Sequence, residues 1–221
     1  VLSGSIYSFR FDPTDTVSAL NFAGFDIVSS ANNHILDYGR IGLSDTVKNL
    51  RAGGIDVALD EPIIKIVGDP ANGGALTRVA FLGFTNLYKG WFSEATAISQ
   101  ITELKSSGKA DIVVVLFHGG EEYQTVSNKY QQNIAHHLVD AGADLFIGAH
   151  PHVAQEVEKY KNSWIAYSLG NFIFDQAFSE ETMRGLMVEA TIEGKKVTDF
   201  REIPIKLSPT FQPYIVSSSS L

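Results

Sequence analysis

The chain of 221 residues carries a formal net charge of −8 at neutral pH, with 44% hydrophobic and 19% charged residues. This balance is typical of a globular protein with a substantial core and excludes a disordered chain. The acidic excess argues against nucleic acid as a partner, although bound cations could still make one cleft attractive to an anion. Because the chain has no cysteine, any metal must be held by nitrogen and oxygen ligands.

The two ends of the sequence carry little structural signal. The first five residues lack the layout of a signal peptide, and no apolar run approaches the roughly 20 residues that span a bilayer. The chain begins without methionine, and its first clear element starts near Asp12, so we expect a fragment of a longer protein. We expect residues 1–216 to form one domain and the serine-rich residues 217–221 to form a tail.

The first part of the chain alternates helices and strands. Asp12 is a good N-cap, Pro13 suits the first helical position, and Gly24 is a typical helix terminator. The predicted elements are a helix from 12 to 24, a strand at 25–29, a helix at 41–52, a strand at 55–59, and a hairpin-like pair at 63–67 and 79–84 separated by a turn signal at 69–74.

The second part begins with two more helix–strand units and then changes character. The predicted elements are a helix at 94–106, a strand at 112–117, a helix at 129–141, a strand at 145–147, an antiparallel pair at 153–160 and 164–168, and a hairpin at 186–192 and 197–205. Parallel units followed by hairpins predict an α/β fold of the layered αββα type rather than a purely parallel sheet.

Metal-type ligands follow three of the predicted strands. His150 and His152 come directly after strand 145–147, His118 ends strand 112–117, and Asn33-His34 follows strand 25–29. Because the carboxyl ends of strands in a parallel sheet face one crevice, we expect these side chains to converge on a single site. Two histidines one residue apart can present two imidazoles to one metal or to two neighbouring metals.

Each candidate also has a purely structural interpretation. His150 and His152 could be exposed turn residues, His118 could be a core histidine bonded to a carbonyl group, and Asn33-His34 could simply form a turn. Their occurrence together at strand ends favours metal ligation.

Further candidates stay open between two roles. Asp37 could orient the His34 imidazole or cap the helix that follows. Glu122 could be a substrate-facing acid or a solvated loop charge, and Asn171 could contact substrate or serve a structural role. His136 and His137 lie on a predicted amphipathic helix, and we interpret them as surface residues outside any site.

Several segments, in order, closely resemble the CapA/PgsA family of poly-γ-glutamate capsule biosynthesis proteins, within the calcineurin-like metallophosphoesterase superfamily. The matching segments are 23–29 running into Ala31-Asn32-Asn33-His34-Ile35-Leu36-Asp37-Tyr38-Gly39, His118-Gly119-Gly120-Glu121-Glu122-Tyr123, 141–147 running into Gly148-Ala149-His150-Pro151-His152, and 167–176 with Gly170-Asn171-Phe172 at its centre. The resemblance extends from about Phe9 to about Arg184.

The resemblance implies a four-layer αββα sandwich of metallophosphoesterase type with a two-metal site. It implies that Asn33, His118 and His150 bind one divalent metal and His152 the other, with His34 assisting the leaving group or stabilising the phosphoryl transition state. Nitrogen and oxygen ligands suit Mn, Fe or Zn. The family's first strand, with its Gly-Asp motif, and the acidic residue that follows it are not found before Phe9, so we expect the dinuclear site in this chain to be incomplete.

Two functions follow as hypotheses. The first is a metallophosphatase-fold protein of poly-γ-glutamate capsule synthesis or export, with metal-dependent hydrolysis of a phosphoester, or of an amide bond of the polymer, as its activity. The second is a non-catalytic scaffold or binding subunit of a membrane-bound polyglutamate synthase, because a fold does not establish an activity. The resemblance implies an anionic polymer or phosphoester substrate, capsule synthase subunits as partners, and the bacterial cell surface as location, through a membrane anchor outside this chain.

Overall fold

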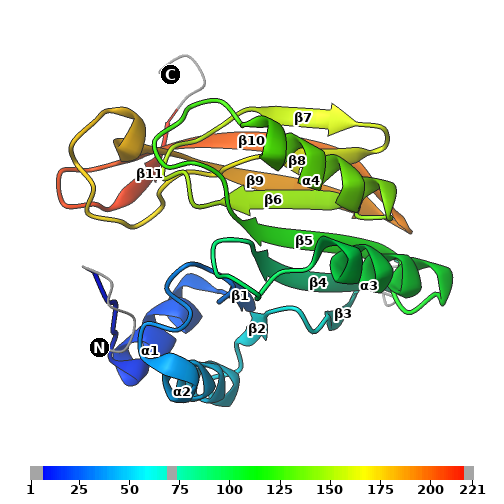
Figure 1. Ribbon diagram of the computed structural model, residues 1–221, viewed down its shortest axis with the longest axis horizontal. Coiled ribbons are helices and arrows are strands. Elements are labelled where there is room, and N and C mark those ends of the chain that lie inside the picture. Colours follow the sequence, from blue (N-terminus) through cyan, green and yellow to red (C-terminus); the bar gives the residue numbers. More distant parts are fainter. Residues whose placement is uncertain (1–6, 69–73, 217–221) are drawn as a thin grey trace.

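The computed structural model describes residues 7–68 and 74–216, which form three β-sheets and four α-helices (Figure 1). The helices are α1 (Pro13–Ala23), α2 (Gly39–Ala52), α3 (Glu94–Ser106) and α4 (Lys129–Asp140), with a short 3₁₀ turn at Glu181–Met183. The strands are β1 (Ile27–Ser29), β2 (Asp56–Ala58), β3 (Ile63–Val67), β4 (Thr77–Thr85), β5 (Ile112–His118), β6 (Leu145–Ala149), β7 (Val157–Tyr160), β8 (Ser163–Ala166), β9 (Arg184–Glu193), β10 (Lys196–Leu207) and β11 (Pro213–Ile215).

The largest sheet has six strands in the order β3-β4-β5-β6-β8-β7. The four central strands run parallel to one another, whereas β3 and β7 are antiparallel edge strands. Both the hairpin-like pair at 63–84 and the antiparallel pair around residue 161 are therefore confirmed. Parallel pairing brings the carboxyl ends of β4, β5 and β6 to one edge, as the helix–strand alternation predicts.

Side chains of β4 and β5 alternate between two cores on opposite faces of this sheet. Val113, Val115 and Phe117 pack with residues of α3 and α4, such as Ile101 and Leu138. On the opposite face, Ile112 and Val114 pack with side chains of β9 and β10 such as Val188 and Phe200. The six-stranded sheet therefore has helices on one face and a second sheet, β11-β10-β9, on the other.

The strands β1 and β2 form a separate two-stranded parallel sheet on the same side as β9 and β10. The backbone N–H of Gly83 donates to Leu59 O, and a Cβ at Gly83 would lie 2.5 Å from Ala58 O. Gly83 is four residues after Val79 on β4, so both residues lie on the same face of the main sheet. β10 packs on that face at Val79, and β2 packs on it at Gly83. Outside β1 and β2, the helices α1 and α2 (blue in Figure 1) pack on Ile55 and Val57. The four-layer αββα sandwich is confirmed, with its second β layer made of two small sheets.

Several details differ from the sequence prediction. Strands β1, β2, β7 and β8 are shorter than expected, and β11 was not predicted because its three residues carry no alternation. The expectation that all ligand-bearing strands share one sheet is wrong, because β1 belongs to the small sheet with β2. Most of the predicted turn at 69–74 and the predicted tail at 217–221 lie outside the described residues. No helix among those residues is both long and apolar enough to cross a membrane.

Asp111 joins the two β layers. This carboxylate, 8% exposed, accepts hydrogen bonds from Arg78 N, Nε and Nη2, and pairs with Lys195 Nζ at 2.9 Å. Arg78 lies on β4, whereas Lys195 lies in the β9–β10 turn. The hydrogen bonds from Arg78 hold the pKa of Asp111 far below its usual range. The ionised carboxylate therefore stabilises the packing of the hairpin against the main sheet.

We predict that Asp111→Asn lowers the free energy of unfolding by about 2 kcal/mol at neutral pH, because charged hydrogen bonds are lost. Since folding depresses the pKa of Asp111, its stabilisation is present above the unfolded pKa of about 3.9 and declines as the pH falls below it. Urea denaturation between pH 3 and pH 8 measures this. The matched control is Glu189→Gln, which removes the exposed Glu189–Arg201 pair and should cost about 0.5 kcal/mol or less. Equal effects of the two substitutions at neutral pH would contradict the assignment.

Candidate metal centre

The predicted ligands meet in one cleft at the carboxyl ends of the strands. In the parallel pairing of β5 with β6, His118 is the partner of Ala149, so His118 and His150 leave the sheet side by side. The loop after β1 reaches the same edge from the second β layer. The cleft has a volume of about 960 Å³. Seven of the eight predicted site residues line it: Asn33, His34, His118, Glu122, His150, His152 and Asn171.

The loop after β1 is a series of tight turns. The Asn32 side chain accepts a hydrogen bond from the His34 backbone N–H at 2.8 Å, which is the Asx turn that this residue type favours. Further backbone hydrogen bonds link Ile35 to Asn32 and Asp37 to His34. With Ala31 and Ile35 buried, the loop is anchored on both sides of Asn33 and His34. These two side chains are therefore held towards the cleft.

The loops after β5 and β6 are tied to each other by their backbones. Gly119 N–H donates to Ala149 O at 2.9 Å, and Tyr123 N–H donates to Pro151 O at 2.8 Å. Gly148 permits the close approach of the next strand, because a Cβ there would lie 2.0 Å from Tyr167 O. The glycine before the histidine pair thus sets the path of the loop that carries both imidazoles.

Backbone strain is concentrated at this site. Among the described residues, five non-glycine residues have positive φ, and three of them are Tyr123 (63°), His150 (108°) and His152 (61°). Such conformations cost of order 1–3 kcal/mol each and persist where the surrounding structure imposes them. Their grouping at one cleft is the pattern expected of a functional site.

His118 and His150 are partly buried imidazoles whose lowered pKa values favour the neutral form. Burial, reinforced by the neighbouring histidines, lowers the pKa of His118 to about 3. Burial also lowers the pKa of His150, against the opposing effect of Glu122. His118 Nε2 lies 3.0 Å from Asn33 Oδ1, close to the roughly 3 Å that separates neighbouring ligand atoms of one ion with bonds of about 2.1 Å. A neutral imidazole beside an amide oxygen is ready to bind a cation without first losing a proton.

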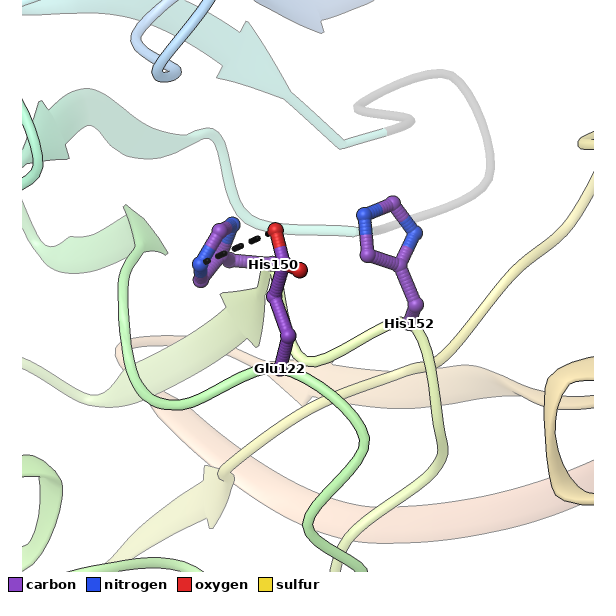
Figure 2. Close-up of side chains that lie close together, drawn as sticks. All are labelled: Glu122, His150 and His152. Carbon is purple, nitrogen blue, oxygen red and sulfur yellow. Dashed lines mark ion pairs between the residues drawn. The ribbon is translucent and has the colours of Figure 1, made fainter. Parts of the chain in front are cut away.

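Glu122, His150 and His152 form the tightest group of metal-type ligands (Figure 2). One donor atom from each lies within 4.8 Å of the others, and Glu122 Oε1 is 3.9 Å from His150 Nε2. In Figure 2 the Glu122 carboxylate rises from the loop after β5 towards the two imidazoles. The buried Nδ1 atom of His150 has no hydrogen-bond partner among the described residues. The nitrogen nearest to the Glu122 carboxylate is the other one, Nε2. A ring with one nitrogen unpartnered and the other near a carboxylate, in a group that includes a second imidazole, fits a divalent metal.

Asn171 orients His152. The Asn171 amide nitrogen donates to the Thr182 carbonyl at 3.1 Å, which fixes the amide so that Oδ1 accepts from His152 Nδ1 at 2.9 Å. His152 therefore keeps the lone pair of Nε2 for a ligand. The substrate role predicted for Asn171 stays a prediction, and its amide already holds the imidazole in place.

Asp37 supports His34 from behind. The Asp37 carboxylate, 4% exposed, lies 2.9 Å from His34 Nδ1 and also accepts from the Phe9 backbone N–H. Helix α2 begins without a side-chain cap. Of the two roles left open by the sequence, the geometry therefore favours orientation of His34. Because the carboxylate can accept a hydrogen bond from Nδ1–H, Nε2 of His34 is left to act in the cleft.

His136 and His137, which the sequence analysis interprets as surface residues, do not line the cleft. His137 is exposed and pairs with Glu94. His136 is partly buried, where it stacks on Tyr160 and bonds to Glu158. The interpretation of His136 as a simple surface residue therefore missed a local polar cluster on α4 and β7.

Sequence reasoning missed the aromatic part of the site. Tyr123 stacks on His152 with ring centroids 5.9 Å apart, and Phe174 lies 5.0 Å from the same imidazole. Phe9 contacts His34 edge-on at 4.6 Å. The unusual run Phe172-Ile173-Phe174, in a segment that forms no strand, was the available signal, because apolar side chains in a loop need a surface to cover.

Comparisons with known proteins identify the family of the chain. The family model described as bacterial capsule synthesis protein PGA_cap matches residues 2–58 and 67–176. The capsule biosynthesis protein CapA of Bacillus anthracis is 39% identical over 183 residues, which cover 75% of this chain and 44% of that protein. The PGA biosynthesis protein CapA of Bacillus subtilis strain 168 is 35% identical over 210 residues, 87% of this chain and 54% of that protein. The chain thus spans about half the length of these curated relatives.

A solved structure is similar in fold. Sulfate thiohydrolase SoxB of Thermus thermophilus aligns with a TM-score of 0.52 at 15% identity, covering 84% of this chain and 33% of that protein. This likeness supports the metallophosphoesterase-type sandwich and no more. Because the family model matches well over half of the residues, the chain belongs to the bacterial capsule synthesis protein family PGA_cap.

Proposed function

We propose that this chain is the metal-binding part of a protein of poly-γ-glutamate capsule synthesis or export, and that it hydrolyses a phosphoester. The observation that carries the proposal is the convergence of Asn33, His118, His150, His152 and Glu122 on one strained cleft. The curated names of the CapA relatives support the capsule setting.

The ligand set divides into two neighbouring groups that share His150. His118 Nε2 and Asn33 Oδ1 are 3.0 Å apart in one group, and Glu122 and His152 form the other group with His150. The ring centroids of His118 and His150 are 5.1 Å apart. A bound divalent metal would act as a Lewis acid towards a phosphoryl oxygen. It would also lower the pKa of a water molecule bound to it, which makes hydroxide available as a nucleophile near neutral pH. We propose Mn, Fe or Zn for this mixture of imidazole, amide and carboxylate donors.

His34 is the proposed proton donor to the leaving group. Asp37 holds the ring through Nδ1, and Phe9 contacts the ring in a T-shaped arrangement, so the ring has little freedom to rotate. When the imidazole is protonated, its Nε2–H can donate to the oxygen that departs from phosphorus. Positioning by a buried carboxylate is the role we propose for Asp37.

The partners and the location that we propose rest on the family and not on the geometry of the cleft. Relatives named as a capsule biosynthesis protein, a PGA biosynthesis protein and a probable polyglutamine synthesis accessory protein support our proposal of partners among the subunits of a membrane-bound capsule synthase. We also propose a location at the bacterial cell surface. A scaffold role without catalysis is the outcome if the metal-loaded protein turns over no phosphoester.

We predict that the wild-type chain binds Mn²⁺ or Zn²⁺ and that Glu122→Gln weakens the affinity roughly tenfold or more, because a charged ligand is replaced by a neutral one. Isothermal titration with each metal measures the change, and elemental analysis gives the stoichiometry. The matched control is Glu121→Gln, which alters the exposed neighbouring carboxylate and should leave the affinity unchanged. The combined variant His150→Ala/His152→Ala should lose the metal, whereas His137→Ala should keep it. Metal content equal in all variants would contradict the site.

We predict that His34→Ala lowers kcat for phenyl phosphate about 100-fold or more at unchanged metal content, since a positioned acid typically contributes that much when the leaving oxygen is basic. Asp37→Asn should lower kcat about tenfold with little change in KM, because the ring is still present but less well oriented. Asp45→Asn, at an exposed position on α2, is the control. Turnover that survives the loss of His34 would rule out its role as the acid.

A further inference from the structure

The cleft around the candidate metal centre has an unusual charge pattern for a protein that handles polyanions. In the part of the chain that the structure describes, no lysine or arginine lines it. Its charged side chains, apart from histidine, are the two carboxylates Glu122 and Asp175. Any anionic group in this cleft would therefore depend on the metal position for its countercharge, and a second anionic group further out would meet no cationic partner.

The walls of the cleft are aromatic and begin at the ligand histidines. In one row of rings, the centroid of Phe174 lies 5.0 Å from that of His152 and 6.1 Å from that of Phe9. In a second row, the ring centroid of Tyr123 lies 5.9 Å from that of His152 and 5.0 Å from that of Phe178. The apolar surface is thus continuous from the metal position to the outer rim.

The rim itself exposes large apolar side chains. Phe11 is 73% exposed, Ile173 70% and Phe178 65%, and all three line the cleft. Single exposed apolar residues are normal, but a group of them beside a polar centre marks a ligand-binding surface. The combination of one anion-binding centre and an apolar rim suits an amphiphilic ligand.

We infer that the cleft binds a phosphate monoester of an apolar alcohol, with the phosphate at the histidines and the apolar body along the aromatic walls. This inference rests on the proposed function for the position of the phosphate. It excludes an extended polyglutamate chain as the preferred occupant of the cleft, because each further carboxylate would be desolvated against aromatic rings without a cation.

The test is isothermal titration of the His34→Ala variant, in which hydrolysis of the probes is slow, with hexyl phosphate and glycerol 1-phosphate, which share a head group, and with a γ-linked pentaglutamate. Each titration is done with and without Mn²⁺. We expect hexyl phosphate to bind about tenfold more tightly than glycerol 1-phosphate, because it buries several additional methylene groups. Phe178→Ser should weaken hexyl phosphate binding about fivefold and leave glycerol 1-phosphate unchanged. The control is Phe22→Ser, since Phe22 is 96% exposed on α1 and lies outside the cleft.

The outcomes separate this inference from the proposed function. A preference for hexyl phosphate that is independent of Mn²⁺ supports the apolar walls and contradicts the metal role. Binding that requires Mn²⁺ without a preference between the two phosphates supports the metal and overturns the inference. Tighter binding of the pentaglutamate than of hexyl phosphate, or no binding of any probe, also overturns it.

Discussion

The parallel pairing of β5 with β6 is the constraint on which the site depends. Because His118 is the partner of Ala149, the two strands end at the same level and His118 and His150 enter the cleft together. Two backbone hydrogen bonds, from Gly119 to Ala149 and from Tyr123 to Pro151, then extend the pairing into the loops. Glu122, between those two donors, is thereby brought to the histidine pair. A shift in this register would separate the imidazoles, whatever the identity of the loop residues.

The second β layer supplies the other half of the site. The loop after β1 carries Asn33 and His34 to the edge where β5 and β6 end, although β1 pairs only with β2 among the described strands. The segment that follows β8 carries Asn171 and Phe174 to the same place. The packing between the two β layers therefore also determines the geometry of the site. Asp111, directly before β5, contributes to that packing through its ion pairs with Arg78 and Lys195. The positive φ angles of His150 and His152 show that this packing imposes conformations that the loop alone would not adopt.

The sequence predicted the elements and the convergence of the candidate ligands better than it predicted sheet membership. Local signals such as the Asp12 cap and the two segments of the hairpin predicted at 186–192 and 197–205 were sufficient for element type. The histidines were found because metal-type side chains directly follow buried strands. Sheet membership of β1 could not be predicted, since three-residue strands carry almost no pattern and their pairing is set by contacts with α2 and β4. The aromatic walls were missed because a loop phenylalanine shows its role only when its neighbours in space are known. For Asp37 the sequence left two roles open, and only the 2.9 Å contact with His34 distinguishes them.

The proposed function depends on a metal held between the loops that follow β5 and β6. The most direct measurement is a crystal structure of the chain grown with Mn²⁺, with anomalous difference maps recorded at the Mn edge. The account predicts a peak about 2.1 Å from imidazole nitrogens of His150 and His152, with a Glu122 oxygen also in contact. A peak at another location, or histidines bonded only to protein groups in crystals that contain Mn²⁺, would contradict it.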